Sequence, residues 1–262
     1  RSLSSAASDV YKRQQLNKPT KPIFEGSNDF EGHSFHSAEW DHSCDLSGKK
    51  VGVIGTGPSA IGFIPKIAEV VNELIIFQRT PNWILPKPDR KFSNVEKWLL
   101  KNMPFFGKLY RYYEYVMSER LYFAFFIKQN KISSILERMI SNLTTGFKIK
   151  NMSSMYKQGQ KMLLEAQISD KSLRDKLTPD YPVGCKRVIP TNDFFPTLER
   201  DNVFLETESI SKFDKDSIIT NDGKKNNVDV IIYGTGFETN IFISPVKIIG
   251  LNNKDLDDVW SN

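Results

Sequence analysis

The clearest alternation of hydrophobic and polar positions lies in residues 49–81. Residues 51–54 form a short apolar run, which is typical of a strand buried in a parallel sheet. Apolar residues then recur with helical spacing over residues 61–71, and a second apolar run covers residues 74–77. This order of strand, helix and strand predicts the first half of a dinucleotide-binding α/β fold.

A glycine turn connects the first predicted strand to the helix. Gly55, Gly57 and Ala60 have the spacing G-x-G-x-x-A, which allows a tight turn, close approach of a pyrophosphate, and close packing of helix on strand. The helix start behind the turn would direct N–H groups and the positive end of its dipole at the phosphates. We therefore expect Gly55, Thr56, Gly57, Ser59 and Ala60 to bind a nucleotide, with a purely structural glycine turn as the alternative.

The end of the second predicted strand indicates which dinucleotide binds. Folds that bind NAD place Asp or Glu about 20 residues after the glycines, to bond the ribose 2′-hydroxyl. This chain has Gln78, Arg79 and Thr80 there. Because a guanidinium can bind a 2′-phosphate with two hydrogen bonds, Arg79 and Thr80 favour NADPH over NADH. A solvated surface arginine is the alternative for Arg79.

Helices are predicted after this first half of the fold. Ser93 and Glu96 have the spacing of a capping box, which marks a helix start. Apolar periodicity then predicts several helices over residues 93–175, interrupted at Pro104 and Gly107.

Many aromatic residues lie in residues 105–126, interspersed with Lys and Arg. We expect these aromatic side chains to pack within the protein, and a helix on a membrane surface is the alternative. No apolar run approaches the roughly 18 residues needed to cross a bilayer. The longest run, residues 121–127, has seven.

Strands are predicted again toward the end of the chain. Apolar runs cover residues 203–207 and 217–220, and a turn signal follows at residues 221–223. Residues 228–237 predict a buried strand that ends in a Thr-Gly turn. Residues 18–49, by contrast, are rich in Pro, Gly, Ser and charged residues and predict a loop or linker.

Composition narrows the class of protein. The 262 residues are 39% hydrophobic and 26% charged, as in a soluble globular protein of one large or two modest domains. A net charge of +5 without a dense basic stripe argues against nucleic acid as a partner. Two cysteines imply no disulfide framework, so we expect a cytoplasmic protein. The three histidines match no standard zinc spacing, so no metal site is predicted.

Residues 1–15 differ from the rest of the chain. They do not begin with Met and lack hydrophobic periodicity. They resemble a translated library linker, so we expect a non-native tail, with a natural disordered tail as the alternative. If the tail is non-native, the natural protein extends upstream of residue 16.

A longer motif lies in the predicted linker. Phe30, Gly32, His36, Trp40 and Asp41 fill every defined position of F-x-G-x-x-x-H-x-x-x-W-[P/D]. This pattern resembles the fingerprint of type I Baeyer–Villiger monooxygenases, in the flavin-containing monooxygenase superfamily. The resemblance implies a segment that joins an FAD domain to an NADP domain and couples their movement. A packing role in the linker is the alternative for His36 and Trp40.

Two further segments are similar to the same family. Residues 177–187 resemble a P-x-Y-P-x-G-C-K-R segment, in which Arg187 matches the active-site arginine and Lys186 helps Arg79 to hold the 2′-phosphate. Residues 228–237 resemble a D-x-x-x-x-A-T-G-F segment that returns from the NADP domain to the FAD domain, and they place Thr235 and Gly236 beside the cofactor. Gly234 replaces the usual Ala there, which we interpret as a more permissive turn.

The resemblance implies an α/β fold with a Rossmann-like NADP-binding domain, a helical insertion and incomplete remnants of an FAD-binding domain. Residues 16–47 would be the linker and residues 48–227 the NADP domain, with the insertion at about residues 93–175. Residues 228–262 would return into the truncated FAD domain. No second G-x-G-x-x-G follows a strand, so we expect the FAD site upstream and an internal fragment that is inactive alone.

The implied activity uses FAD, NADPH and O₂. NADPH reduces the flavin, the reduced flavin activates O₂, and one oxygen atom is inserted into a ketone to give an ester or lactone. Arg187 would stabilise developing negative charge. The alternatives are an N- or S-oxygenating flavin monooxygenase, which usually carries a different aromatic at the place of Trp40, and a non-catalytic NADP-binding module.

Overall fold

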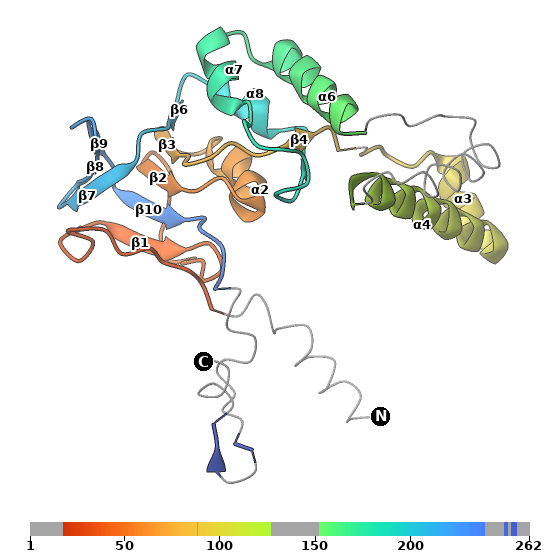
Figure 1. The fold of residues 1–262 in the computed structure, drawn as a ribbon, viewed down its shortest axis with the longest axis horizontal. Coiled ribbons are helices and arrows are strands. Elements are labelled where there is room, and N and C mark those ends of the chain that lie inside the picture. Colours follow the sequence, from red (N-terminus) through yellow and green to blue (C-terminus); the bar gives the residue numbers. More distant parts are fainter. Residues whose placement is uncertain (1–17, 88, 127–151, 239–248, 251–252, 256–262) are drawn as a thin grey trace. The chain divides into compact units, whose positions relative to one another are not determined.

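The computed structural model describes residues 18–87, 89–126, 152–238, 249–250 and 253–255 (Figure 1). The chain forms two compact units, one of residues 1–80 with 197–262 and the other of residues 81–196. The predicted tail at residues 1–15 lies outside the described residues. The predicted domain boundaries rest on the family resemblance and stay predictions.

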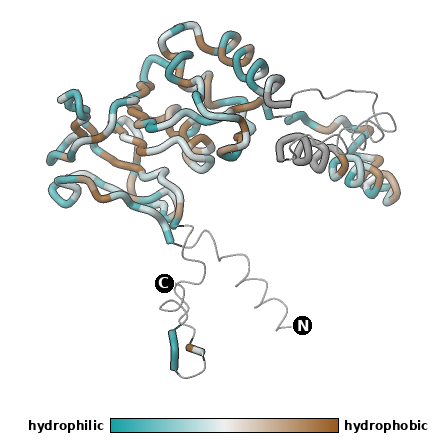
Figure 2. The backbone as a smooth tube through the Cα atoms, viewed as in Figure 1, coloured by the Kyte–Doolittle hydropathy of each residue, from teal (hydrophilic) through white to brown (hydrophobic). Residues whose placement is uncertain are grey.

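A five-stranded parallel sheet is the centre of the first unit, with strands in the order β1-β10-β2-β3-β6. Its strands are β1 (His33–His36), β2 (Lys50–Ile54), β3 (Glu73–Phe77), β6 (Val203–Glu206) and β10 (Val230–Tyr233). The central strands carry unbroken buried apolar runs, which Figure 2 shows as hydrophobic segments. The strands predicted at residues 51–54, 74–77, 203–207 and 228–237 are therefore confirmed.

Helix α2 (Pro58–Ile67) joins β2 to β3. Its buried residues, Ala60, Ile61, Ile64 and Ile67, form one apolar stripe, as expected of a helix that covers one face of a parallel sheet. Pro58 occupies the first turn, where a missing N–H costs nothing. The predicted helix is confirmed, although it begins earlier and ends earlier than residues 61–71.

A small antiparallel sheet packs on the large one. It consists of β7 (Ile210–Asp214), β8 (Ser217–Thr220) and β9 (Lys225–Asn227), in that order. Phe213 and Ile218 share one hydrophobic cluster with Ile75, Phe77 and Ile231 of the large sheet. The two sheets therefore enclose a common core, and Gly223, with φ +84°, forms the predicted turn after β8.

The predicted loop over residues 18–49 is wrong at His33–His36. These residues form edge strand β1, paired in parallel with β10, and Phe35 and His36 are buried. The sequence His-Ser-Phe-His has weak strand propensity. Its conformation follows from pairing with a strand far along the chain, which no local pattern encodes.

The second unit is mostly helical. Its elements are α3 (Asn94–Asn102), α4 (Pro104–Phe126), α6 (Met152–Gln167), α7 (Lys171–Leu177), the start of α8 (Phe194–Leu198), and the paired short strands β4 (Ile84–Leu85) and β5 (Ile189–Pro190). The predicted capping box is confirmed, since the Glu96 N–H donates to Ser93 Oγ over 3.2 Å and the Ser93 N–H donates to Glu96 Oε2 over 2.8 Å. Buried Gln160 joins α6 to the strand β4 by accepting the Ile84 N–H over 3.0 Å.

One expectation for the helices is wrong. Pro104 separates α3 from α4, but Gly107 lies inside α4 without ending it. One glycine costs a helix only about 1 kcal/mol, which neighbouring turns offset. Phe105, Tyr112, Tyr113 and Tyr115 are exposed in the described part of the chain, and their expected packing, which includes packing between domains, stays a prediction. Among the described residues, no helix combines the length and apolar character needed to cross a membrane.

Candidate functional site

The candidate site lies at the carboxyl edge of the parallel sheet. Strand β2 leads through α2 to β3 on one side, whereas β10 pairs with β2 on its other side. Neighbouring strands whose connections run in opposite directions form a crevice at their carboxyl ends, where α/β folds bind ligands. The glycine turn after β2 and the Thr-Gly turn after β10 both lie at this edge.

Gly55 holds the two turns in contact. It has φ +99°, and a Cβ on Gly55 would lie 2.8 Å from the carbonyl oxygen of Gly234. The Gly55 N–H donates to the Phe77 carbonyl over 2.9 Å, and the Gly234 N–H donates to the Ile54 carbonyl over 2.8 Å. Gly55 is therefore required by its backbone conformation and by the space available.

Gly57 differs from Gly55 in its surroundings. Its φ of −65° suits any residue, and the nearest protein atom to an added Cβ is the Gly234 oxygen at 3.5 Å. The fold itself therefore does not need a glycine at this position. The missing side chain of Gly57 leaves open space beside the turn, which is what the approach of a pyrophosphate requires.

Helix α2 begins at this turn without a capping side chain. Its N-cap is Gly57, its first turn contains no acidic residue, and the Ile61 N–H donates to the Gly57 carbonyl over 3.0 Å. A helix start of this kind attracts anions through its N–H groups and its dipole. Ser59 is exposed and Ala60 is fully buried, so Ser59 offers a polar side chain to solvent here.

The interpretation of Gly234 is corrected by its neighbours. The φ angle of Gly234 is not positive, so the backbone conformation of this turn does not require a glycine. A Cβ there would lie 2.8 Å from the Cβ of Ala60 and 3.4 Å from the carbonyl oxygens of Ile54 and Gly55. Gly234 is therefore a packing requirement, because α2 and the end of β10 approach too closely for two methyl groups.

Thr235 and Gly236 contact a segment near the start of the described chain. The Thr235 hydroxyl donates to the Thr20 carbonyl, and the Thr20 N–H donates to the Gly236 carbonyl over 2.9 Å. Pro19 and Phe237 form an antiparallel bridge beside them. The Thr235 hydroxyl proton is thus used within the protein, so this hydroxyl could contact a cofactor only as a hydrogen-bond acceptor.

The fingerprint residues make packing contacts in the first unit. Phe30 packs edge-on against Phe213 of β7, with ring centroids 6.4 Å apart. Trp40 packs edge-on against Phe35 and Phe63 at 5.3 and 5.4 Å, which ties the fingerprint to α2.

Gly32 and Asp41 complete the fingerprint. A Cβ on Gly32 would lie 2.4 Å from the Asp229 carbonyl oxygen, so only glycine fits. The Asp41 carboxylate accepts the Ser43 hydroxyl over 2.6 Å and the Ser43 N–H over 2.9 Å, and these bonds lower the Asp41 pKa. The ring contacts of Trp40 support the packing alternative for that residue, and the predicted coupling of domain movement stays a prediction.

His36 is the buried histidine of the fingerprint. Its Nδ1 accepts the Ala38 N–H over 3.1 Å, which places the ring proton of the neutral form on Nε2. Its ring packs edge-on against Phe237 at 5.7 Å. Burial lowers the His36 pKa, and a weaker effect of the Gly236 carbonyl opposes this shift. The surroundings of His36 therefore favour its neutral form.

The remaining predicted residues are divided between the units. Arg79 is exposed and Thr80 half-buried just after β3 in the first unit. Lys186 and Arg187 are exposed in a loop of the second unit. The predicted 2′-phosphate clamp and the predicted role of Arg187 combine residues of both units, so they stay predictions.

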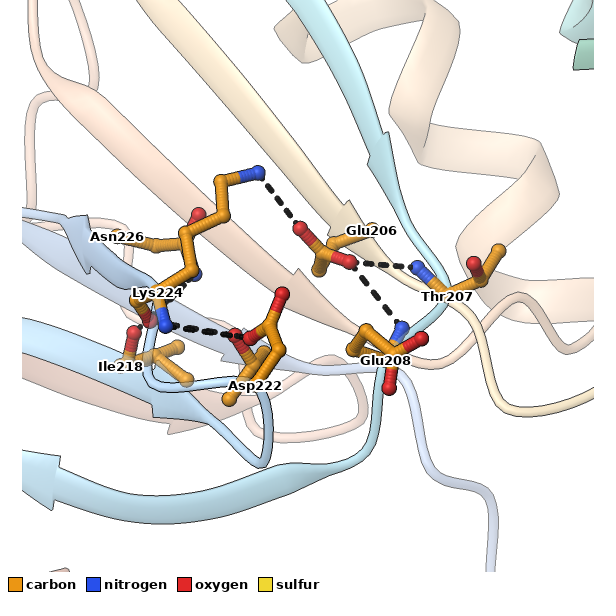
Figure 3. A network of polar contacts seen from close by, with 8 residues as sticks. Glu206, Thr207, Glu208, Ile218, Asp222, Lys224 and Asn226 are labelled. Atoms are coloured by element: carbon orange, nitrogen blue, oxygen red, sulfur yellow. Dashed lines mark hydrogen bonds and ion pairs between the residues drawn. The ribbon is translucent and has the colours of Figure 1, made fainter.

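A cleft of about 410 Å³ lies elsewhere on the first unit, between the large sheet and strand β9. Its lysines are paired with acids: Lys50 with Glu73 at 3.2 Å, and Lys224 with buried Glu206 at 2.7 Å (Figure 3). Glu206 also accepts two backbone N–H groups. Sequence patterns did not single out Glu206, and its satisfied contacts indicate a structural role. Among the described residues, no His/Cys/Asp/Glu group could hold a metal.

Comparison with known proteins adds an independent observation. Residues 14–254 match the family model described as flavin-binding monooxygenase-like. The chain is 37% identical over 246 residues to a Baeyer-Villiger monooxygenase of Pseudomonas aeruginosa and 33% identical over 245 residues to one of Streptomyces coelicolor. Each alignment covers 94% of this chain and 43% of the relative, so the chain spans less than half the length of either.

Solved structures share the fold. OTEMO in complex with FAD and NADP is similar with a TM-score of 0.70 and 27% identity, over 94% of this chain and 51% of that one. Cyclohexanone monooxygenase in an open form shares the fold, with a TM-score of 0.69.

Proposed function

The chain belongs to the flavin-binding monooxygenase-like family, and from this premise we propose that it is the NADPH-binding part of a Baeyer–Villiger monooxygenase. The observation that carries the proposal is the close approach of the turns that follow the paired strands β2 and β10, where Gly55 lies against Gly234 and Gly57 leaves space. The chain covers 43% of its curated relatives, so the proposed activity is that of the whole protein.

The described residues fit the proposed nucleotide. Gly55, Gly57 and the first turn of α2 would hold the pyrophosphate through backbone N–H groups. Arg79, Thr80 and Lys186 would bind the 2′-phosphate, which a carboxylate at the end of β3 would repel. FAD, when bound to the whole protein, supplies the oxygen-activating chemistry, with O₂ and a small-molecule ketone as substrates.

Arg187 is the proposed catalytic residue of this chain. A guanidinium stays charged and offers several donors, which suits stabilisation of negative charge that develops on oxygen. In the whole enzyme, Arg187→Ala should abolish ester formation while NADPH still binds. Ester formation at the normal rate in this variant would refute the role of Arg187.

The nucleotide site itself is tested with Gly57→Ala. The fold tolerates a methyl group at Gly57, but a bound pyrophosphate does not, so NADPH affinity should fall at least about tenfold with the melting temperature unchanged. Gly62→Ala is the matched control, because no atom lies within 4 Å of an added Cβ there. Unchanged NADPH affinity in Gly57→Ala would count against nucleotide binding at this turn.

The substrate class is tested in the whole enzyme. Comparing product formation from ketones and from thioethers distinguishes the proposed activity from N- or S-oxygenation. NADPH binding by a protein that never takes up flavin would instead favour a non-catalytic module.

The free cysteines, buried Cys44 and exposed Cys185, fit a reducing compartment, and we propose a cytoplasmic location.

A further inference from the structure

The loop that carries Lys186 is anchored through Tyr181. The Tyr181 hydroxyl donates to the Pro81 carbonyl over 2.9 Å, and Trp83 Nε1 donates to the Tyr181 carbonyl over 3.2 Å. The Trp83 and Tyr181 rings also pack edge to face, with centroids 6.3 Å apart. Contacts at the hydroxyl, the backbone and the ring edge therefore fix the Tyr181 ring.

One face of this ring contacts Lys186. Lys186 Nζ lies 4.8 Å from the centre of the Tyr181 ring, within the range of a cation–π interaction. Gly184, with φ +97°, and a hydrogen bond from the Cys185 N–H to the Pro182 carbonyl form the turn that brings Lys186 back over Tyr181. Lys186 makes no ion pair with any acid in the part of the chain that the structure describes.

This arrangement holds a cation without neutralising it. A carboxylate partner would fix the lysine and also cancel the charge that a phosphate needs. A ring face attracts the ammonium group but carries no net charge, so the full positive charge remains available to an anion.

We propose that Tyr181 is a positioning residue that holds the Lys186 ammonium group for the 2′-phosphate and thereby contributes to selectivity for NADPH over NADH. This inference rests on the proposed function, in which Lys186 binds that phosphate. Tyr181 itself does not touch the cofactor, so its effect should be confined to the ligand that carries the 2′-phosphate.

The test titrates the full 262-residue chain and its variants with NADPH and, separately, with NADH. Tyr181→Leu should weaken NADPH binding about two- to fivefold, the value of an exposed cation–π contact, and leave NADH binding unchanged. Tyr181→Phe keeps the ring face and should retain most of the selectivity. In a Lys186→Met background, Tyr181→Leu should have no further effect on NADPH binding.

The outcomes separate this inference from the proposed function. If Lys186→Met leaves NADPH binding unchanged, the proposed 2′-phosphate clamp is wrong. If Lys186→Met weakens NADPH binding but Tyr181→Leu does not, or weakens NADH equally, only the role of Tyr181 is overturned. Should Tyr181→Leu fail to fold, increasingly fluorinated phenylalanines at position 181 keep the ring shape and weaken its negative face. NADPH affinity should then fall with each added fluorine, and a constant affinity would overturn the inference.

Discussion

Gly234→Ala is the substitution whose effect follows most directly from the structure. The new methyl carbon would lie 2.8 Å from the Cβ of Ala60, whereas carbon atoms pack best at about 3.5–4.0 Å. The carbonyl oxygens of Ile54 and Gly55, each 3.4 Å from the new methyl carbon, prevent it from moving away from Ala60 in their directions. The end of β10 or the start of α2 must therefore move. Overpacking of this kind costs about 1–3 kcal/mol, so the first unit should be destabilised by that amount.

Ala60→Gly provides the test of this explanation. It removes the methyl group that Gly234→Ala would meet, at a cost of up to about 1 kcal/mol for glycine in a helix. If the two methyl groups clash, the double variant should be more stable than the sum of the single effects predicts. We expect a coupling of about 1–2 kcal/mol in this double-mutant cycle.

Hydrogen exchange, followed by mass spectrometry on peptides from β2, β3 and β10, reports opening of the first unit alone. Gly234→Ala should speed exchange there about 5- to 150-fold, and adding Ala60→Gly should slow it again. Gly62→Ala, in the same helix but with open space around it, should leave exchange unchanged or slower. Exchange in Gly234→Ala within about twofold of the parent, or strictly additive single effects, would refute the packing explanation.

Three further predictions concern the same unit. Gly32→Ala brings a methyl group to 2.4 Å from a backbone oxygen, so it should lower the midpoint of urea unfolding more than Gly234→Ala does. Burial opposes ionisation of Glu206, but Lys224 and backbone N–H groups outweigh it and lower the Glu206 pKa. Lys224→Met should lower the free energy of unfolding by about 1–2 kcal/mol at pH 7. This difference should disappear as the pH falls below 4.5, the ordinary pKa of the carboxyl group, and then through the lowered pKa of Glu206. His36 must be neutral to stay buried, so stability should decline as the pH falls below 6.5, by at most about 1.4 kcal/mol per pH unit. His36→Asn should flatten that decline between pH 8 and pH 5.5, whereas substitution of exposed His42 by Gln should not.

The strand, glycine turn and helix of residues 50–67 could be predicted because each is encoded locally. The apolar run predicts a strand buried on both faces, the spaced glycines predict the turn, and the apolar stripe predicts the helix. These three signals lie next to one another in the sequence. Strand β9 shows the opposite case. Lys225, Asn226 and Asn227 carry no strand signal, and the strand forms because Asn226 is buried and donates to the Ile218 carbonyl over 3.3 Å.

The candidate site was only partly predictable for a related reason. The turn of Gly55–Gly57 is a local motif, but its contact with Gly234 depends on the sheet order, in which β10 returns to the side of β2. The role proposed for Tyr181 is equally non-local, since its partners are Pro81 and Trp83. Patterns along the chain identify the residues of such a site but not the neighbours that fix them.

The contacts around β10 join the fingerprint to the glycine turn of Gly55–Gly57 within the first unit. Strand β10 lies between β1, which carries His36, and β2, which ends at Gly55. Beyond β10, residues 236–238 are fixed to residues 18–20 by backbone hydrogen bonds, with an ion pair of 3.0 Å between Lys18 and Glu238. Because Gly234 touches both Gly55 and Ala60, a displacement of residues 234–238 must also displace the turn proposed to hold the pyrophosphate. The fingerprint therefore borders the proposed nucleotide site through packed backbone, which gives a physical route by which movement at residues 18–20 would change the shape of that turn.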